Sequence, residues 1–413
     1  VDQPLNSTES GVKQAAGTSD TGCAASVAAG VAAQPAHNIA LQGLTHPYDD
    51  TFWTQRAPGA NAARIDVPVF GCVSWQDDEV SSRAITTLGA LDASRTWLVA
   101  TNGYHGMCEL STPRITGELV AFLSHFVQGA DNGFEHTPHV QIWHDTTTDA
   151  AGNHVPSWVT SFASYASMPV RPLTLYFQSD GRLSQTPPVA GAKPDSYAYP
   201  GPSLGTEDGD VAGQHNVLWK TEEPPGASLS YTTAPLTRDT ELFGSGSANL
   251  WVSSTAPDTD LQITLTEVRP DGQEVYVAGG WLRASHRALD PARSTALAPY
   301  QTDQQADARP LVPGRPTSMR VQLWPFDYVF RKGSSIRLWV DAPTGLTGGW
   351  LLSFLPTPAV DTVYADARHP SAIVLGHLAG GHAETPLPAC DTLLNQPCRR
   401  NVVPVPPGTT TIR

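Results

Sequence analysis

The sequence has little positive charge, and it contains no long apolar run. Only four of its 25 basic residues are Lys, and 39 acidic residues bring the net charge to −14 at pH 7. Such a surface repels phosphate backbones, so no nucleic-acid partner is expected. No apolar stretch approaches the roughly 20 residues of a membrane-spanning helix, so no membrane partner is expected either.

Charged residues are also scarce, at 15%, whereas Gly and Pro are abundant, with 35 and 36 copies. This composition favours a loop-rich protein dominated by β-strands over a helical bundle. The length of 413 residues predicts two or three domains. The sequence has neither an initial Met nor a signal-like apolar region, and we interpret Val1 as a processed or truncated end.

The five cysteines indicate an oxidising compartment, and hence a secreted, extracellular protein. Cys390 and Cys398 flank a short loop and are predicted to form a local disulfide. Cys72 and Cys108 are predicted to pair, because each lies near the end of one of two neighbouring strands. Cys23 is then left over, which suggests a free thiol or a bond to another polypeptide.

No metal or cofactor is expected from the sequence. The cysteine spacings match no zinc motif. Four histidines fall close together in the chain, but their spacings fit no standard metal-binding pattern; they are His136, His139, His144 and His154.

The first part of the chain predicts a linker followed by an α/β layer. Residues 1–36 are rich in small residues and indicate a linker. Within residues 37–168, the apolar runs 65–73 and 96–101 are typical of strands buried in a parallel sheet. Two clear strands would leave a sheet with bare edges, so we expect most of this domain to lie outside the sequence.

Two helices are predicted near these strands, and short strands with frequent turns are predicted in the rest of the chain. The spacing of apolar residues predicts helices over 81–91 and 113–129. Residues 169–413 contain short alternating segments and frequent turns, which predict an antiparallel β-sandwich with a Pro-rich tail. The predicted fold is therefore an α/β part followed by an all-β domain.

Acidic residues and a histidine follow the two predicted strands. Asp77, Asp78 and Glu79 come after the first, and His105 comes after the second. Functional groups gather at the carboxyl ends of strands in open α/β sheets. Acid before His is also the order of a Ser-Asp-His triad on such a sheet. The alternative is that the acid caps a helix and the His lies in a solvated loop.

The segments around these residues resemble the X-Pro dipeptidyl-peptidase and cocaine-esterase family of α/β-hydrolases. Residues 74–77, Ser-Trp-Gln-Asp, are similar to the Gly-Trp-x-Asp segment of the family's catalytic acid, with Ser in place of Gly. Residues 103–106, Gly-Tyr-His-Gly, resemble in altered form the segment of the family's catalytic histidine. Further similar segments are 46–53, 122–129, 241–244, 252–254, 258–260, 270–272 and 281–285.

The resemblance implies a serine hydrolase of X-Pro dipeptidyl-peptidase type, which acts as a peptidase, esterase or amidase on a small ester or peptide. It implies that Asp77 is the catalytic acid and His105 the catalytic base, and the Trp-x-Asp register favours Asp77 over its neighbour Asp78. It also implies the C-terminal part of an α/β-hydrolase domain over 37–168, a jelly-roll sandwich over 169–413, and a cap-region remnant as a second interpretation of 1–36.

Four more residues are candidates for binding the substrate. Trp75 and Tyr104 each lie beside a predicted catalytic residue and are expected to line a pocket, although core packing is the alternative. Asp49 and Asp50 are candidates by their chemistry alone, since a peptidase that acts near an N-terminus needs negative charge for the substrate's ammonium group.

In this family a Gly-x-Ser-x-x-Gly elbow after a strand holds the nucleophile, and no such elbow follows a predicted strand in this sequence. The superficially similar segment 244–247 lies within a predicted strand region and is rejected. We expect this chain alone to be incomplete and inactive. A companion N-terminal chain or segment, linked in one arrangement through Cys23, would supply the Ser. The alternatives are a sequence that covers part of the gene product, or a non-catalytic binding or structural module that uses its sandwich.

Overall fold

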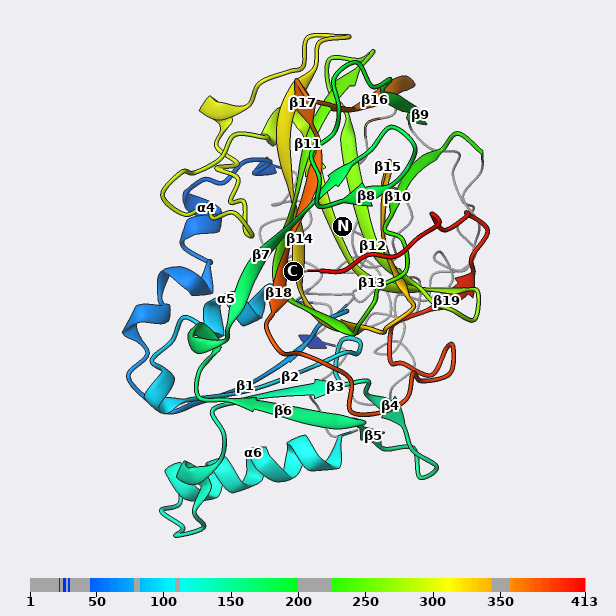
Figure 1. Ribbon diagram of the computed structural model, residues 1–413. Helices are drawn as coiled ribbons and strands as arrows, with labels where there is room; N and C mark the ends of the chain where they lie inside the picture. Colours follow the sequence, from blue (N-terminus) through cyan, green and yellow to red (C-terminus); the bar gives the residue numbers. More distant parts are fainter. Residues whose placement is uncertain are drawn as a thin grey trace.

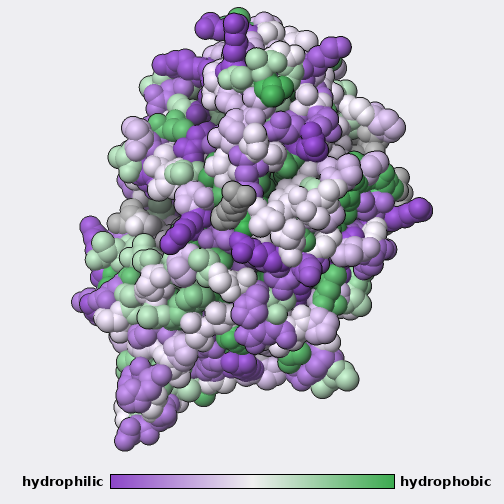
Figure 2. Space-filling model, in the orientation of Figure 1, coloured by the Kyte–Doolittle hydropathy of each residue, from purple (hydrophilic) through white to green (hydrophobic). Residues whose placement is uncertain are grey.

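The computed structural model describes residues 45–77, 82–107, 112–199, 225–343 and 357–412, together with Gly22, Ala25, Ser26, Ala29 and Leu355. Within these residues, no helix has the length and apolar character needed to cross a membrane. On the face shown in Figure 2, hydrophilic and hydrophobic residues are interspersed.

A four-stranded sheet forms the first layer, and its strand order is β1-β2-β3-β6. The first three strands run parallel and the fourth is antiparallel to β3. Figure 1 shows helix α6 along one face of this sheet and the strands of the two larger sheets on its other side. The bounds are β1 (Val69–Ser74), β2 (Thr96–Thr101), β3 (Val140–His144), β6 (Trp158–Phe162), α5 (Ala84–Leu88) and α6 (Pro113–Phe126).

Strand β2 explains why both faces of this sheet are covered. All six of its residues are buried, and side chains alternate between the two faces of a strand. Trp97 packs against α6 through Phe122, whereas Leu98 and Ala100 belong to a cluster that includes Phe243 of the sandwich. The apolar run 96–101 was predicted as a buried parallel strand for this reason, and the prediction is confirmed.

The sheet is larger than the sequence pattern indicated. Only two strands were clear from the sequence, but β3 adds a third parallel strand and β6 a fourth strand. Strand β3 is entirely buried, although it contains the polar residues Gln141 and His144. Those polar residues interrupt the apolar pattern, so the sequence did not indicate this strand.

Two antiparallel sheets form the predicted β-sandwich. The five-stranded sheet has the order β10-β15-β12-β13-β19, and the eight-stranded sheet runs β17-β16-β11-β18-β7-β8 with β14 on β11 and β9 on β16. One apolar cluster fills the space between them: Ile263 and Leu338 come from the first sheet, and Leu250 and Val321 from the second.

The strands of the sandwich begin with β7, after the four-stranded sheet has ended with β6. A small hairpin of β4 (Thr147–Thr148) and β5 (His154–Val155) lies between β3 and β6 in sequence. The bounds of the sandwich strands are β7 (Val170–Phe177), β8 (Leu183–Ser184), β9 (Asp195–Tyr199), β10 (Ser228–Thr232), β11 (Thr240–Ser254), β12 (Asp260–Val268), β13 (Gln273–Arg283), β14 (Thr317–Phe330), β15 (Ser335–Asp341), β16 (Ala359–Asp366), β17 (His369–Pro370), β18 (Ala372–Leu378) and β19 (Cys398–Arg400).

Glycine permits a very close approach of two strands in the sandwich. A Cβ at Gly280 of β13 would lie 1.9 Å from the backbone oxygen of Gln322 on β14. The segment 244–247, rejected above as a nucleophile elbow, lies inside β11 at a β-bulge between Gly244 and Gly246.

One predicted disulfide is present. Cys390 and Cys398 are bonded, with their Cα atoms 5.6 Å apart, and Cys398 begins β19, which pairs with β13. The bond therefore fastens the tail to the five-stranded sheet. Cys72 is also disulfide-bonded, but its predicted partner Cys108 lies outside the described residues, as does Cys23.

Candidate functional site

Asp77 and His105 meet at the carboxyl ends of β1 and β2. The parallel register pairs Ser74 with Thr101, so the loops that follow the two strands start side by side. The Nδ1 atom of His105 lies 3.1 Å from Oδ2 of Asp77 and 3.2 Å from Oδ1. The structure therefore brings together the two residues that the sequence proposed as acid and base.

The two side chains of this pair differ in exposure. Asp77 is 11% exposed and His105 is 42% exposed. A carboxylate can only accept, so the His105 Nδ1–H donates, and in this tautomer the basic lone pair of the ring is on Nε2. This is the arrangement that a general base requires, with the imidazole tautomer and orientation held by an acid.

Gln76 ties the acid loop to the histidine loop and to the sandwich. Its side chain is buried, and Nε2 donates to the backbone oxygen of Val277 on β13 at 2.8 Å. Its Oε1 accepts from the Gly103 N–H at 3.3 Å. Asn395 Nδ2 in turn donates to the Gln76 backbone oxygen at 2.6 Å. The sandwich and its C-terminal tail therefore hold the loops that carry Asp77 and His105.

Asn102 makes a second set of contacts beneath the histidine loop. Its Nδ2 donates to the backbone oxygens of Thr146 at 2.9 Å and Leu394 at 3.2 Å, and the Thr146 N–H donates to its Oδ1 at 2.7 Å. The next residue, Gly103, has φ +150°, and a Cβ there would lie 2.8 Å from Met107 Cγ. Only glycine fits this turn without moving Met107.

Sequence reasoning missed both amide residues. Gln76 lies inside the Trp-x-Asp motif as its variable position, and Asn102 follows a strand. The available signal was an amide side chain next to a buried apolar run. Each amide has one backbone partner in the sandwich or the C-terminal tail, 201 residues away for Gln76 and 292 for Asn102, so no local pattern indicated these contacts.

Tyr104 lies beside the pair, whereas Trp75 is a core residue. The Tyr104 hydroxyl is 3.3 Å from His154 Nε2, and the two rings meet edge to face. Trp75 is 5% exposed and packs edge-on against Phe243 between the sheet and the sandwich. This burial agrees with the core-packing alternative for Trp75, and the pocket-lining role of both residues stays a prediction.

Asp49 and Asp50 belong to a segment that packs on a loop of the sandwich. Asp50 caps helix α4 (Thr51–Thr54) and accepts from His46 Nδ1 at 2.5 Å, and this hydrogen bond is the largest cause of its lowered pKa. The backbone N–H of Asp49 donates to the Asp303 oxygen at 2.8 Å. The structure describes no hydrogen bond or ion pair between these carboxylates and the Asp77–His105 pair. Asp78 and Glu79 lie outside the described residues.

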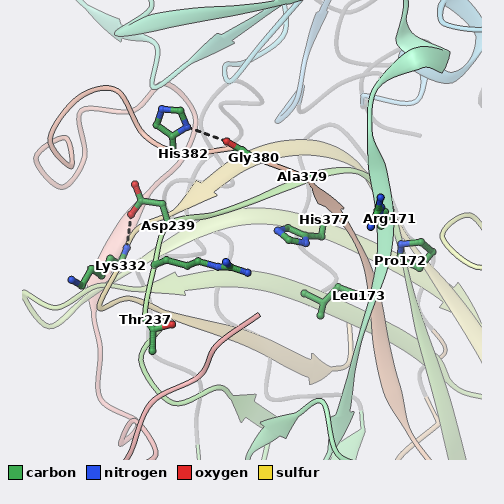
Figure 3. A pocket seen from close by; sticks show the side chains of 12 residues that line it. Arg171, Pro172, Leu173, Thr237, Asp239, Lys332, His377, Ala379, Gly380 and His382 are labelled. Carbon is green, nitrogen blue, oxygen red and sulfur yellow. Dashed lines mark hydrogen bonds between the residues drawn. The ribbon is translucent and has the colours of Figure 1, made fainter. Parts of the chain in front are cut away.

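A basic cavity of about 720 Å³ opens in the sandwich. Arg171, Arg238, Lys332 and His377 are among its lining residues. Figure 3 shows the side chains of Arg171, Lys332 and His377 around it. Burial and the neighbouring charge of Arg238 lower the pKa of His377. Neither Asp77 nor His105 lines this cavity, so it is separate from the candidate catalytic pair.

Two family models match the chain. The model described as the X-Pro dipeptidyl-peptidase C-terminal non-catalytic domain matches residues 132–347, which is more than half of the chain. The model described as X-Pro dipeptidyl-peptidase (S15 family) matches residues 5–107, which include both Asp77 and His105.

Curated relatives match over only part of their own length. A Mycobacterium bovis protein that is named as a serine esterase is 29% identical over 267 residues, which cover 63% of this chain and 40% of that protein. The cocaine esterase of a Rhodococcus species is 24% identical over 369 residues, 81% of this chain and 60% of its own. The chain thus spans less than two thirds of these relatives.

Solved structures share the fold. A CocE/NonD family hydrolase from Staphylococcus aureus superimposes with a TM-score of 0.65 at 18% identity, and it covers 82% of this chain and 59% of its own. An α-amino acid ester hydrolase gives a TM-score of 0.61 at 19% identity, over 84% and 62% of the two chains.

Proposed function

Because this chain belongs to the X-Pro dipeptidyl-peptidase and cocaine-esterase family, we propose that it is part of a serine hydrolase that cleaves a small ester or peptide through a Ser-His-Asp triad. The observation that carries the proposal is the hydrogen bond between His105 and Asp77 at the carboxyl ends of two parallel strands. His105 accepts the proton of the nucleophile and passes it to the leaving group, and Asp77 stabilises the imidazolium that forms.

The nucleophilic Ser of this proposal lies in a preceding part of the protein or in a companion chain. Two observations support this. The matched relatives are longer than the chain, which spans 40% and 60% of them. Strand β1 stands at the end of the four-stranded sheet as described, and such an edge can pair with a further strand. Cys23 is the proposed attachment point if the companion is a separate chain.

The remaining parts of the proposal concern location, domain type and specificity. The Cys390–Cys398 disulfide supports a secreted protein. The two antiparallel sheets are proposed to form a jelly roll, as in the resemblance. Peptidase activity of X-Pro dipeptidyl type and esterase activity both remain within the proposal, since the matched families and relatives carry both names.

Covalent labelling tests the function. The complete gene product, produced in its native host, is treated with a fluorophosphonate probe, and we expect labelling of a Ser in the segment or chain that accompanies these residues. His105→Ala and Asp77→Ala are each expected to abolish turnover and labelling with little loss of folding. Asp78→Ala, at the competing acid, is expected to retain activity.

A matched control distinguishes a catalytic histidine from any exposed His–Asp pair. His286 Nδ1 lies 3.2 Å from Asp303 Oδ1 on the sandwich, a geometry close to that of the candidate pair. His286→Ala should leave labelling and turnover unchanged. If the native protein takes up no label, the hydrolase proposal fails and the binding-module function replaces it. If His105→Ala retains full activity, His105 is not the catalytic base.

A further inference from the structure

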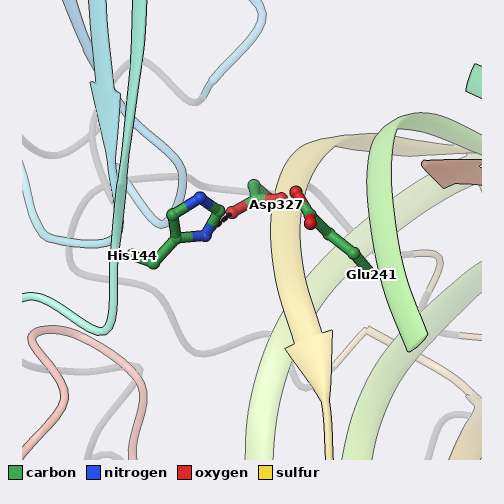
Figure 4. Close-up of side chains that lie close together, drawn as sticks. All are labelled: His144, Glu241 and Asp327. Carbon is green, nitrogen blue, oxygen red and sulfur yellow. Dashed lines mark ion pairs between the residues drawn. The ribbon is translucent and has the colours of Figure 1, made fainter. Parts of the chain in front are cut away.

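A buried cluster of one histidine and two carboxyl groups lies where the four-stranded sheet meets the sandwich. Its members are His144 at the end of β3, Glu241 at the start of β11 and Asp327 on β14. One ligand atom of each lies within 4.8 Å of the others, and Figure 4 shows the carboxyl groups turned toward one another. The three residues are 3%, 3% and 5% exposed.

Protein donors do not satisfy this cluster. His144 Nδ1 lies 2.9 Å from Asp327 Oδ2, and its Nε2 lies 3.0 Å from the Thr160 hydroxyl. No N–H or alcohol donor among the described residues is a partner of Glu241 Oε1 or Asp327 Oδ1, although both atoms are buried. The two carboxyl groups interact with each other instead. Two neighbouring carboxylates repel each other when both are ionised, so a cation bound between them would be stabilising.

The charge of the cluster points the same way. The neighbouring cation Arg331 is already paired with Asp145. When a divalent cation binds two carboxylates and a neutral imidazole, the two negative charges of the carboxylates balance the charge of the ion.

We propose that His144, Glu241 and Asp327 bind one divalent cation of the zinc class, which links the four-stranded sheet to the sandwich. Imidazole nitrogen and carboxylate oxygen are ligands for Zn²⁺ at about 2.0–2.2 Å, so atoms this close need to move little to share one ion. The Thr160 hydroxyl orients the imidazole ring as outer-shell partners do. Because the ligands are buried, the ion stabilises the structure and takes no part in substrate chemistry.

The sequence offered no motif for this site. The histidine was considered with its neighbours in the chain, and no metal was expected. The proposed ligands come instead from three strands in two different sheets. Glu241 and Asp327 meet because β11 and β14 pair, with Phe243 opposite Asp327.

Metal analysis of the complete protein tests the proposal. Protein stripped with a chelator is titrated with Zn²⁺, and Co²⁺ loading is followed by its visible absorption. We expect one equivalent per chain, a higher melting temperature with metal, and a Co²⁺ spectrum of a low-symmetry nitrogen and oxygen site. Glu241→Gln keeps the shape of the side chain but removes a ligand charge, and it should weaken Zn²⁺ affinity by at least about tenfold.

The stability of the same variant distinguishes a metal site from a pair of carboxyl groups that share a proton. Without a metal, Gln resembles protonated Glu, so Glu241→Gln would be as stable as the parent or more stable, and no equivalent of Zn²⁺ would bind. Asp303→Asn, which alters the exposed His286–Asp303 pair, is the control and should retain binding. The proposal is wrong if no Zn²⁺ binds to the parent protein, if Glu241→Gln binds Zn²⁺ as tightly as the parent, or if both variants lose affinity equally.

Discussion

Replacing Arg331 with Met should cost about 3–5 kcal/mol of unfolding free energy, because it strands a buried carboxylate. Arg331 Nη2 pairs with Asp145, and both side chains are only 9% exposed. Arg331 Nη1 also donates to the Val329 backbone oxygen at 2.8 Å, and the guanidinium lies 5.3 Å from the ring centre of Trp158. The pair joins the end of β3 to the end of β14.

Two contributions to the unfolding free energy account for this magnitude. A hydrogen bond to a charged group contributes roughly 1.5–3 kcal/mol, and a buried charge without its partner adds a desolvation cost. Burial already raises the pKa of Asp145, so in the variant this carboxyl group would bind a proton more readily. Protonation of Asp145 would limit the loss of unfolding free energy. We therefore expect a loss within the usual range for one broken buried ion pair.

Urea denaturation followed by tryptophan fluorescence measures the change. The control is Arg182→Met, because Arg182 Nε also pairs with a carboxylate, Asp180 at 2.6 Å, but these side chains are 55% and 52% exposed. Its loss should be at most about 1 kcal/mol. If Arg331→Met lowers the stability no more than Arg182→Met at an unchanged slope, the reasoning from burial is refuted.

Two further predictions use the same structure. Gly280→Ala should lower the stability by about 1–3 kcal/mol, because its Cβ would lie 1.9 Å from the Gln322 backbone oxygen. The control is Gly117→Ala in α6, where a Cβ would meet nothing within 4 Å. This variant should raise the stability by about 0.5–1 kcal/mol. Similar shifts of the denaturation midpoint in both variants would contradict the close approach. Gln76→Leu should cost about 1–3 kcal/mol and lower kcat of the complete enzyme, because Gly103 N–H and the Val277 oxygen lose their partner. An unchanged kcat would show that Gln76 does not position His105.

Local patterns were sufficient for much of the fold. Alternating segments predicted the strands that the structure places at β12, β13 and β15, and apolar runs predicted β1 and β2. These signals are local because burial imposes its period on neighbouring residues of one strand. The meeting of Asp77 and His105 was predictable for a related reason: consecutive parallel strands end at the same edge of a sheet. Their catalytic role stays a prediction.

Whatever depends on distant contacts was decided by the tertiary structure alone. Strand β3 carries polar residues that looked unfavourable for burial, yet His144 finds its partners on β11 and β14. Trp75 resembled a pocket residue from its place beside Asp77, but the sandwich covers it with Phe243. A sequence pattern reports which residues avoid water, whereas the partners of a buried polar group depend on how separate sheets pack, and no spacing along the chain records that.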